Sequence, residues 1–479
     1  MFDYAKAAVE GALNAGATYA DARVVIATQE SVDVLNQAVE SVDRTESAGV
    51  GVRALMGSSW GFYGTADLTD DSAQKAGAMA AEIARASTMV PGPPLELADV
   101  PVISDSYTTP YEEDPLDVPL SEKVDLLVET TKIMQSVDGV ALAKGSLTSW
   151  VTDKWFVSSQ GHEIHQRLLE TGGGYDASAI GEHEIQRRSY PQSFGQFETG
   201  GFETIRAWDY PGNAQRIAEE AVQLLTADEM EEGEMQLILE ASQLALQIHE
   251  SVGHAIELDR ILGWEAAFAG TSHLKLPKLN SHRYGSDLMN ITADATLPGA
   301  LGTFGYDDEG TPAQRVDIVK DGTWVGVLSG RDSAAIAGLP PGGMVRADNF
   351  NRLPMVRMTN VGLVAGDSSL DEIVSETDDG VYMSTNRSWS IDDKRLNFQF
   401  GCEVGWEVKK GKLGRMLKNP TYTGITPQFW GTLDMLAGGE EWVHWGTPNC
   451  GKGQPMQVAH TGHSAAPARF SNVRVGVKA

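Results

Sequence analysis

The first ninety residues combine helical and strand-like hydrophobic patterns. Apolar positions over residues 4–15 recur with the spacing of an amphipathic helix. Thr69 or Asp70 stands where it can cap an alanine-rich helix over residues 71–87. Between these helices, β-branched segments predict strands at residues 22–27, 32–35, 48–55 and 59–63. The last two segments flank Gly57, which predicts a pair of strands around a turn. Together, these elements predict a helix–sheet–helix unit of the α+β class.

Residues 91–119 interrupt this pattern, because they contain seven prolines, many acidic residues and little periodicity. We expect an extended connector there. Helical patterns follow over residues 120–136 and 212–226. Strand-like segments between these two helices include residues 150–157 and 163–168. We therefore expect an N-terminal α+β domain over residues 1–210 that includes the connector.

The second half opens with a strand-like segment, residues 235–239, followed by the apolar run of residues 244–248. Ser242 is suited to cap the helix that contains this run. Short strand-like segments then alternate with Gly, Pro and Asp turns, for example residues 315–319 and 323–328. This spacing predicts a mostly-β C-terminal domain over residues 230–479, with a sandwich or barrel-like core. We find no internal repeat and no low-complexity segment.

The hexapeptide that follows the apolar run begins and ends with histidine and has a glutamate, Glu250, at its second position. Two imidazoles and a carboxylate on one short segment can hold a zinc ion and place a general base beside it. His249 and His254 are five residues apart, which separates them by about 140° on a regular α-helix. If they share a metal, we expect a π-type bulge or a local break at Val252–Gly253. Alternatively, both histidines only cap or pack a helix, and the motif alone does not decide between these alternatives.

A zinc site of this kind needs a third protein ligand. Candidates elsewhere in the chain are Cys402, Cys450, His444, His460 and His463. Cys450 lies in a glycine-flanked segment that predicts a loop, where nearby Lys452 would favour a thiolate. Cys402 lies in an apolar segment and reads as a small buried strand residue. We interpret His460 and His463 as surface or edge-strand residues. Two further histidines, His162 and His165, have the setting of strand residues.

Five acidic residues near these motifs have more than one interpretation. Glu257 and Asp259 follow the hexapeptide and could orient a ligating histidine, but they could equally end a solvated helix. Asp307, Asp308 and Glu309 precede Gly310, which favours a hairpin turn. The alternative for these three is an acidic rim that faces a substrate.

Composition limits the classes of partner. The 479 residues carry a formal net charge of −29, which argues against nucleic acid or an anionic membrane as a partner, although solubility explains this charge equally well. With two cysteines there is no disulfide framework, so a reducing compartment fits. The first residues lack a basic region followed by an apolar one, and no apolar stretch approaches the about 20 residues of a membrane span. We expect a cytoplasmic protein.

Several separated runs occur in the order found in the TldD/PmbA family. These runs are His249–His254, Tyr306–Pro312, Pro354–Asn360 and Asn449–Gly453. The Gly49–Gly64 hairpin followed by residues 65–69 fits as well. The chain thus resembles a TldD-type metalloprotease over nearly its full length. It departs from the family at Ser384–Ser390, which lacks the glycine-rich run often found there, and this affects the expected loop shape and not the metal site.

The resemblance implies a zinc peptidase with His249, His254 and Cys450 as ligands and Glu250 as catalytic base. It also implies an N-terminal α+β domain and a mostly-β C-terminal domain that carries the metal-binding helix. Family members work as dimers, either with themselves or with a TldE/PmbA-type paralogue that lacks the metal motif. Their substrates are unfolded or extended peptides, including precursors of peptide antibiotics. The alternative function is that of the non-catalytic, peptide-binding partner, which has no need of all four residues.

Overall fold

The N-terminal half of the computed structural model is built on one long, curved sheet. The structure describes residues 1–90, 92–453 and 456–477, so Pro91 of the expected connector and Ala479 at the expected end of the second domain lie outside the described residues. The sheet order is β3-β2-β1-β5-β6-β4, with β7 and β8 also paired to β6. Its strands are β1 (Tyr19–Leu35), β2 (Ala38–Met56), β3 (Ser59–Thr65), β4 (Ser104–Thr108), β5 (Val140–Ser158), β6 (Glu163–Ile180), β7 (Ile185–Tyr190) and β8 (Gln196–Thr199).

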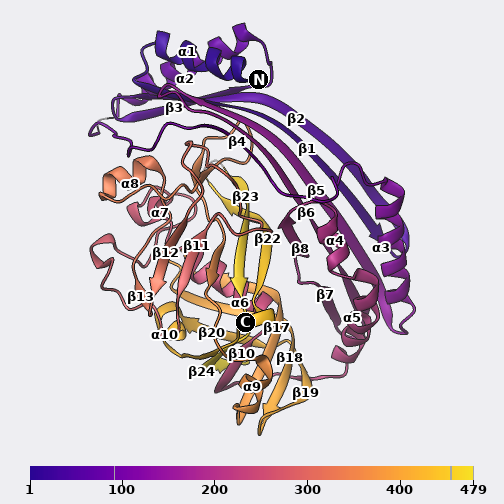
Figure 1. The fold of residues 1–479 in the computed structure, drawn as a ribbon. Helices are drawn as coiled ribbons and strands as arrows, with labels where there is room; N and C mark the ends of the chain where they lie inside the picture. Colours follow the sequence, from indigo (N-terminus) through magenta and orange to yellow (C-terminus); the bar gives the residue numbers. More distant parts are fainter. Residues whose placement is uncertain (91, 454–455, 478–479) are drawn as a thin grey trace.

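Helices cover the two ends of this sheet on its convex side, whereas its concave side faces the C-terminal half (Figure 1). The helices are α1 (Phe2–Asn14), α2 (Asp70–Ser87), α3 (Leu120–Gln135), α4 (Glu203–Ala207) and α5 (Tyr210–Leu224). Thr69 caps α2, because its side chain accepts a hydrogen bond from the amide of Ser72 at 3.3 Å. Helices α1 and α2 approach closely at glycine, since a Cβ on Gly77 would lie 1.9 Å from the Ala8 carbonyl oxygen. This arrangement confirms the helix–sheet–helix prediction.

Two sequence expectations for this half need adjustment. The segments 22–27 and 32–35 belong to one continuous strand, β1, which pairs with β2 along its whole length. The connector is extended as expected, but residues 104–108 form β4, which pairs in parallel with β6. A short strand in the connector therefore extends the sheet at one edge.

The C-terminal half contains a closed ring of strands. Five strands follow one another in the order β17-β10-β24-β20-β18, and β18 pairs back to β17. They are β10 (Gly233–Leu239), β17 (Asp379–Ile391), β18 (Asn397–Lys409), β20 (Thr421–Ile425) and β24 (Ala468–Val475). Strands β9 (Asp228–Glu229), β19 (Lys412–Lys418) and β21 (Leu433–Leu436) extend this sheet. The α+β class with a mostly-β C-terminal part is confirmed.

A four-stranded sheet, in the order β13-β12-β11-β16, two strand pairs, β14-β15 and β22-β23, and short helices make up the rest of this half. The strands are β11 (Ile291–Asp294), β12 (Arg315–Lys320), β13 (Thr323–Trp324), β14 (Val345–Arg346), β15 (Met355–Val356), β16 (Val361–Leu363), β22 (Val443–Lys452) and β23 (Gln457–Ala465). The helices are α7 (Leu258–Leu262), α8 (Arg331–Ala337), α9 (Leu370–Ser375) and α10 (Thr426–Gly431). The strand expected over residues 323–328 is therefore confined to its first two residues. None of the helices in the described ranges combines the length and apolar character needed to cross a bilayer.

Helix α6 (Ala241–Ile248) lies in the main core of this half, and all of its residues are buried. It begins after Glu240, not at Ser242 as expected, and Glu240 makes no side-chain cap. The hydroxyl of Ser242 instead donates to the Glu240 carboxylate. A helix held by apolar burial on every side depends less on a capping side chain than an exposed helix does.

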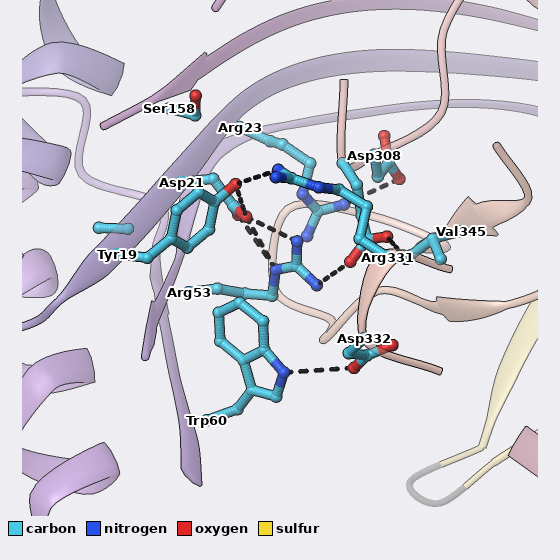
Figure 2. Close-up of polar contacts among 12 residues, drawn as sticks. Tyr19, Asp21, Arg23, Arg53, Trp60, Ser158, Asp308, Arg331, Asp332 and Val345 are labelled. Atoms are coloured by element: carbon cyan, nitrogen blue, oxygen red, sulfur yellow. Dashed lines mark hydrogen bonds and ion pairs between the residues drawn. The ribbon is translucent and has the colours of Figure 1, made fainter. Parts of the chain in front are cut away.

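A buried charge cluster joins the concave face of the N-terminal sheet to the C-terminal half. We define it as Asp21, Arg23, Arg53, Lys154, Asp308 and Glu309. Arg23 and Lys154 pair with Asp308 at 3.1 and 2.6 Å, and Arg53 pairs with Glu309 at 3.0 Å. Figure 2 shows Arg23 and Arg53 lying side by side between Asp21 and Asp308.

Residues 307–309 do form part of a turn, with Tyr306 bridged to Pro312. An acidic rim facing a substrate is wrong, because all three carboxylates are buried: Asp308 and Glu309 pair with basic side chains, and Asp307 accepts hydrogen bonds from backbone amides.

Candidate metal centre

The segment that follows α6 forms a π-helical turn over His249–Gly253. The amide of His254 donates to the carbonyl of His249 at 3.2 Å, which is the i→i+5 bond that defines such a turn. The slower winding brings the two imidazoles together, with ring centroids 4.9 Å apart. The π-bulge predicted from the five-residue interval is confirmed. Glycine at position 253 avoids an overlap, because a Cβ there would lie 2.1 Å from the Met358 sulfur.

Cys450 completes a cluster with these two histidines. The ligand atoms of His249, His254 and Cys450 all lie within 4.8 Å of one another, and each residue is buried. The Cys450 sulfur is 3.7 Å from Nε2 of His254. Cys450 lies in β22 opposite Ala459 of β23, so the expected loop setting is wrong, although its glycine neighbour Gly451 follows in the same strand. The structure thus brings together the three residues that sequence analysis named as metal ligands.

Cys402 lies in β18, in the core of the barrel, as expected. Burial, together with the carboxylates of Glu240 and Glu403, raises the pKa of its thiol well above the ordinary value. Cys450 differs. Burial raises its pKa, but His254 and the Arg357 guanidinium outweigh that effect and leave it below the ordinary value. The charge environment therefore favours a thiolate at Cys450 and a thiol at Cys402.

His463 orients His249, a role that sequence analysis missed. Its Nε2 lies 2.7 Å from Nδ1 of His249, and its own Nδ1 lies 2.9 Å from the Val361 carbonyl oxygen. A carbonyl can only accept, so Nδ1 of a neutral His463 donates to it and Nε2 accepts from His249. That arrangement leaves Nε2 of His249 with a free lone pair. His463 is fully buried, so the expected surface setting is wrong, although it lies on an edge strand, because β23 belongs to a two-stranded sheet with β22.

The remaining candidate histidines lie outside the cluster. His444 contacts the Ser464 hydroxyl at 2.7 Å, and His460 pairs with Glu170 at 2.7 Å. His162 precedes β6 and contacts Ser158, whereas His165 lies in β6 and pairs with Asp153. The strand setting of His165 and the edge-strand setting of His460 in β23 are as expected, whereas the strand setting of His162 is wrong.

Glu257 orients the second histidine of the cluster. Its carboxylate lies 3.0 Å from Nδ1 of His254, which leaves Nε2 of that ring facing Cys450. Glu257 and Asp259 are buried and both pair with the ammonium of Lys452, so a solvated helix end is wrong. Lys452 is thus engaged by these two carboxylates. Hydrogen-bonded carboxylates that fix a histidine tautomer are common behind metal ligands.

The donor set fits a zinc ion on chemical grounds. Burial lowers the pKa of both His249 and His254, which favours the neutral imidazoles that metal binding requires. Two imidazoles and a thiolate are three of the four ligands of a tetrahedral catalytic zinc site, and the fourth position remains for water or substrate.

Glu250 stands on the π-turn between the two histidines. It is 6% exposed, and its carboxylate forms an ion pair with the guanidinium of Arg395. No motif in the sequence pointed to Arg395, because it lies 145 residues away in the turn between two barrel strands.

A cavity of about 350 Å³ opens next to the cluster, between the concave face of the N-terminal sheet and β23. Trp150, Lys154, Glu170, Arg346 and His460 are among its lining residues. Ala459, which pairs with Cys450 across the β22–β23 hairpin, also lines it. The three candidate ligands do not line this cavity.

Comparison with protein families assigns most of the chain to one family. The family model described as PmbA/TldA metallopeptidase C-terminal domain matches residues 232–476. The models for domain 1 and for the central domain of the same family match residues 20–84 and 113–227.

Curated relatives carry matching names. A metalloprotease from Methanothermobacter thermautotrophicus is 28% identical over 96% of this chain and 95% of its own. A metalloprotease from Methanocaldococcus jannaschii is 27% identical over 85% of this chain and 86% of its own. A protein from Saccharolobus solfataricus that is named a zinc metalloprotease TldD homologue is 26% identical over 43% of this chain and 44% of its own.

Solved structures share the fold. A candidate modulator of DNA gyrase from Thermotoga maritima superposes with a TM-score of 0.78 at 16% identity, covering 99% of each chain. TldE from Thermococcus kodakarensis superposes with a TM-score of 0.71 at 16% identity, covering 98% of this chain and 99% of that one. The family resemblance read from the motifs is confirmed, and the chain belongs to the TldD/PmbA family of metallopeptidases.

Proposed function

We propose that this chain is a zinc-dependent peptidase with His249, His254 and Cys450 as metal ligands and Glu250 as catalytic base. The observation that carries the proposal is the π-turn, because it directs both histidines toward the thiol of Cys450. The names of the curated relatives support a metalloprotease, and the Saccharolobus relative is named for zinc.

When bound, zinc would polarise the scissile carbonyl and lower the pKa of a coordinated water toward about 7. Glu250 is buried beside the ligands without being one of the three, so its carboxylate, which pairs with Arg395, would accept a proton from that water and pass it to the leaving amine. His463 and Glu257 hold the two imidazoles in the tautomers that keep Nε2 available. A thiolate donates more charge than an imidazole, so this centre would be a weaker Lewis acid than a three-histidine site.

The proposed substrates are unfolded or extended peptides, including precursors of peptide antibiotics. Glu250 and the three ligands are nearly fully buried, so a folded protein could not bring a peptide bond to them. We place the approach of an extended segment in the cavity between the N-terminal sheet and β23, because its lining residue Ala459 pairs with Cys450. The net charge of −29 supports peptides over nucleic acid or a membrane surface as partners.

Metal analysis joined to a hydrolysis assay tests this function. Purified protein should contain one zinc ion per chain and should cleave a quenched fluorescent peptide of about ten residues. A chelator should abolish cleavage, and added zinc should restore it. Protein without zinc and without hydrolysis would favour the alternative, a non-catalytic peptide-binding partner, to which the shared fold with TldE lends support.

We further propose that the chain works in the cytoplasm as a dimer, either with a second copy or with a TldE/PmbA-type paralogue. Exposed aromatic side chains such as Trp389 provide apolar surface for an interface. Light scattering at micromolar concentration should give twice the monomer mass, for the chain alone or after addition of the paralogue. A monomer under both conditions, or ready cleavage of a folded protein, would contradict the enclosed dimeric site.

A further inference from the structure

Arg395 reaches the candidate centre from the barrel. It lies in the turn between β17 and β18, and its guanidinium pairs with the carboxylate of Glu250. Both side chains are largely buried: 17% of the Arg395 side chain and 8% of the Glu250 side chain, counted without the backbone, are exposed. Nε of Arg395 is buried and has no hydrogen-bond partner within residues 1–90, 92–453 and 456–477. The guanidinium therefore holds an unused donor beside the proposed base.

The backbone around Arg395 is held in an uncommon conformation. Arg395 has a φ of +60°, which is unfavourable for a residue with a side chain. The Asp392 carboxylate accepts hydrogen bonds from the amides of Lys394, Leu396 and Asn397. The Thr426 hydroxyl donates to the Arg395 carbonyl oxygen at 2.8 Å. Residues in sparsely populated conformations that their surroundings enforce cluster at functional sites.

A second segment packs against the same turn. The amides of Thr271 and His273 donate to the carbonyls of Asp393 and Lys394 at 3.1 and 2.8 Å. Gly270 allows this approach, since a Cβ there would lie 2.5 Å from the Asp393 carbonyl oxygen. The backbone of the turn is thus held from two sides, and this fixes the point from which the Arg395 side chain reaches Glu250.

We propose that Arg395 is a second catalytic residue, which pairs with Glu250 in the free protein and donates to the scissile carbonyl oxygen of a bound peptide. This inference rests on the proposed peptide hydrolysis. As water attacks, its oxygen bonds to the carbonyl carbon, its proton passes to Glu250, and the carbonyl oxygen becomes negative. The C–N bond then breaks with its electron pair on nitrogen, and Glu250 returns the proton to the leaving amine.

The movement of negative charge during hydrolysis explains why Arg395 would change its hydrogen-bond partner from Glu250 to the carbonyl oxygen. Protonation removes the negative charge of Glu250 at the moment when charge develops on the carbonyl oxygen. A guanidinium stays protonated throughout the reaction. It is therefore attracted first to the Glu250 carboxylate and then to the scissile carbonyl oxygen, as the negative charge moves from one to the other. In the free protein, the ion pair with Arg395 also holds the Glu250 carboxylate in place until a substrate binds. Arg395 would thereby stabilise the transition state more than the ground state.

The test compares Arg395→Ala and Arg395→Lys with Lys394→Ala, a control that removes one positive charge from the exposed neighbour in the same turn. We expect Arg395→Ala to keep its zinc and its KM for the quenched peptide while kcat falls about 10²–10³-fold, as for loss of an oxyanion donor. Arg395→Lys should recover part of kcat, because it restores the charge without the planar fork. Lys394→Ala should match the wild type.

A binding measurement gives a readout that does not depend on turnover. A phosphinic peptide carries a tetrahedral anion where the peptide bond would be, whereas an N-methylated peptide of the same sequence resembles only the ground state. Calorimetry should show that Arg395→Ala weakens the phosphinic peptide about 10²–10³-fold and leaves the N-methylated peptide unchanged.

Three outcomes would overturn the proposal. If Arg395→Ala retains full kcat while the wild type hydrolyses peptide, only the role of Arg395 is wrong. If zinc is lost from both Arg395 variants, the residue has a structural role. If the wild type neither hydrolyses the peptide nor binds the phosphinic analogue, the proposed function fails together with this inference.

Discussion

At the scale of single residues, the candidate centre depends on which ring nitrogen of each histidine is free. His463 fixes His249 through a chain of hydrogen bonds that ends at the Val361 carbonyl. We predict that His463→Phe lowers zinc affinity about 10–100-fold, because Nδ1 of His249 loses the partner that holds its tautomer. Competition with a zinc chelator of known affinity measures this. His444→Phe, on the neighbouring strand, is the control, and equal affinities in the two variants would contradict the assignment.

The two cysteines offer a matched pair of substitutions. Cys450 lies beside His254 with a lowered pKa, whereas Cys402 lies in the barrel core with a raised one. We predict that Cys450→Ala loses most of its zinc and keeps its fold, and that Cys402→Ala retains zinc with some loss of stability. Metal analysis and circular dichroism on both proteins check this. The reverse pattern of zinc loss would mean that the third ligand is wrong.

At the scale of elements, the π-turn requires glycine at position 253. An alanine Cβ would overlap the Met358 sulfur, and overpacking of a core costs about 1–3 kcal/mol. We predict that Gly253→Ala lowers the melting temperature and the zinc content together, and that adding Met358→Ala restores part of both. Gly431→Ala serves as control, because that helical glycine has open space around it. A fully metallated Gly253→Ala protein would show that the turn tolerates a side chain.

The π-turn that carries the two histidines could be predicted from the sequence, whereas most of the contacts around it could not. The interval between His249 and His254 was sufficient for the π-turn, because two rings on one metal constrain the winding between them. The strand setting of Cys450 was missed, since the glycines around it are as common in turns as in tight strand contacts. The roles of His463 and Arg395 depend on pairings between distant strands, and no local pattern encodes these.

At the scale of the whole molecule, the buried charge cluster links the N-terminal sheet to the half that carries the centre. Asp308 was expected in a turn, but its partners, Arg23 and Lys154, belong to β1 and β5 and could be identified only from the fold. Removing one partner of a buried pair leaves the other charge uncompensated. We predict that Asp308→Asn costs about 3–5 kcal/mol of unfolding free energy.

This variant should also change the response to acid. Burial raises the pKa of Asp308, but Lys154 and Arg23 lower it further, so it lies below the ordinary value. A lowered pKa contributes stability above about pH 4 that is lost as the pH falls through the folded value. Melting temperatures of Asp308→Asn should therefore decline less steeply below about pH 4 than those of the wild type. Asp71→Asn, at an exposed pair with Lys75, is the control and should follow the wild type.

The measurement that tests the central claim most directly is the zinc content and peptide hydrolysis of Glu250→Gln. Glu250 lies on the π-turn among the three proposed ligands without being one of them. The variant should therefore retain one zinc ion per chain and lose about 10²–10⁴-fold in kcat, because an amide cannot accept the proton of the attacking water. Loss of zinc would make Glu250 a ligand, and undiminished turnover would remove it from the mechanism.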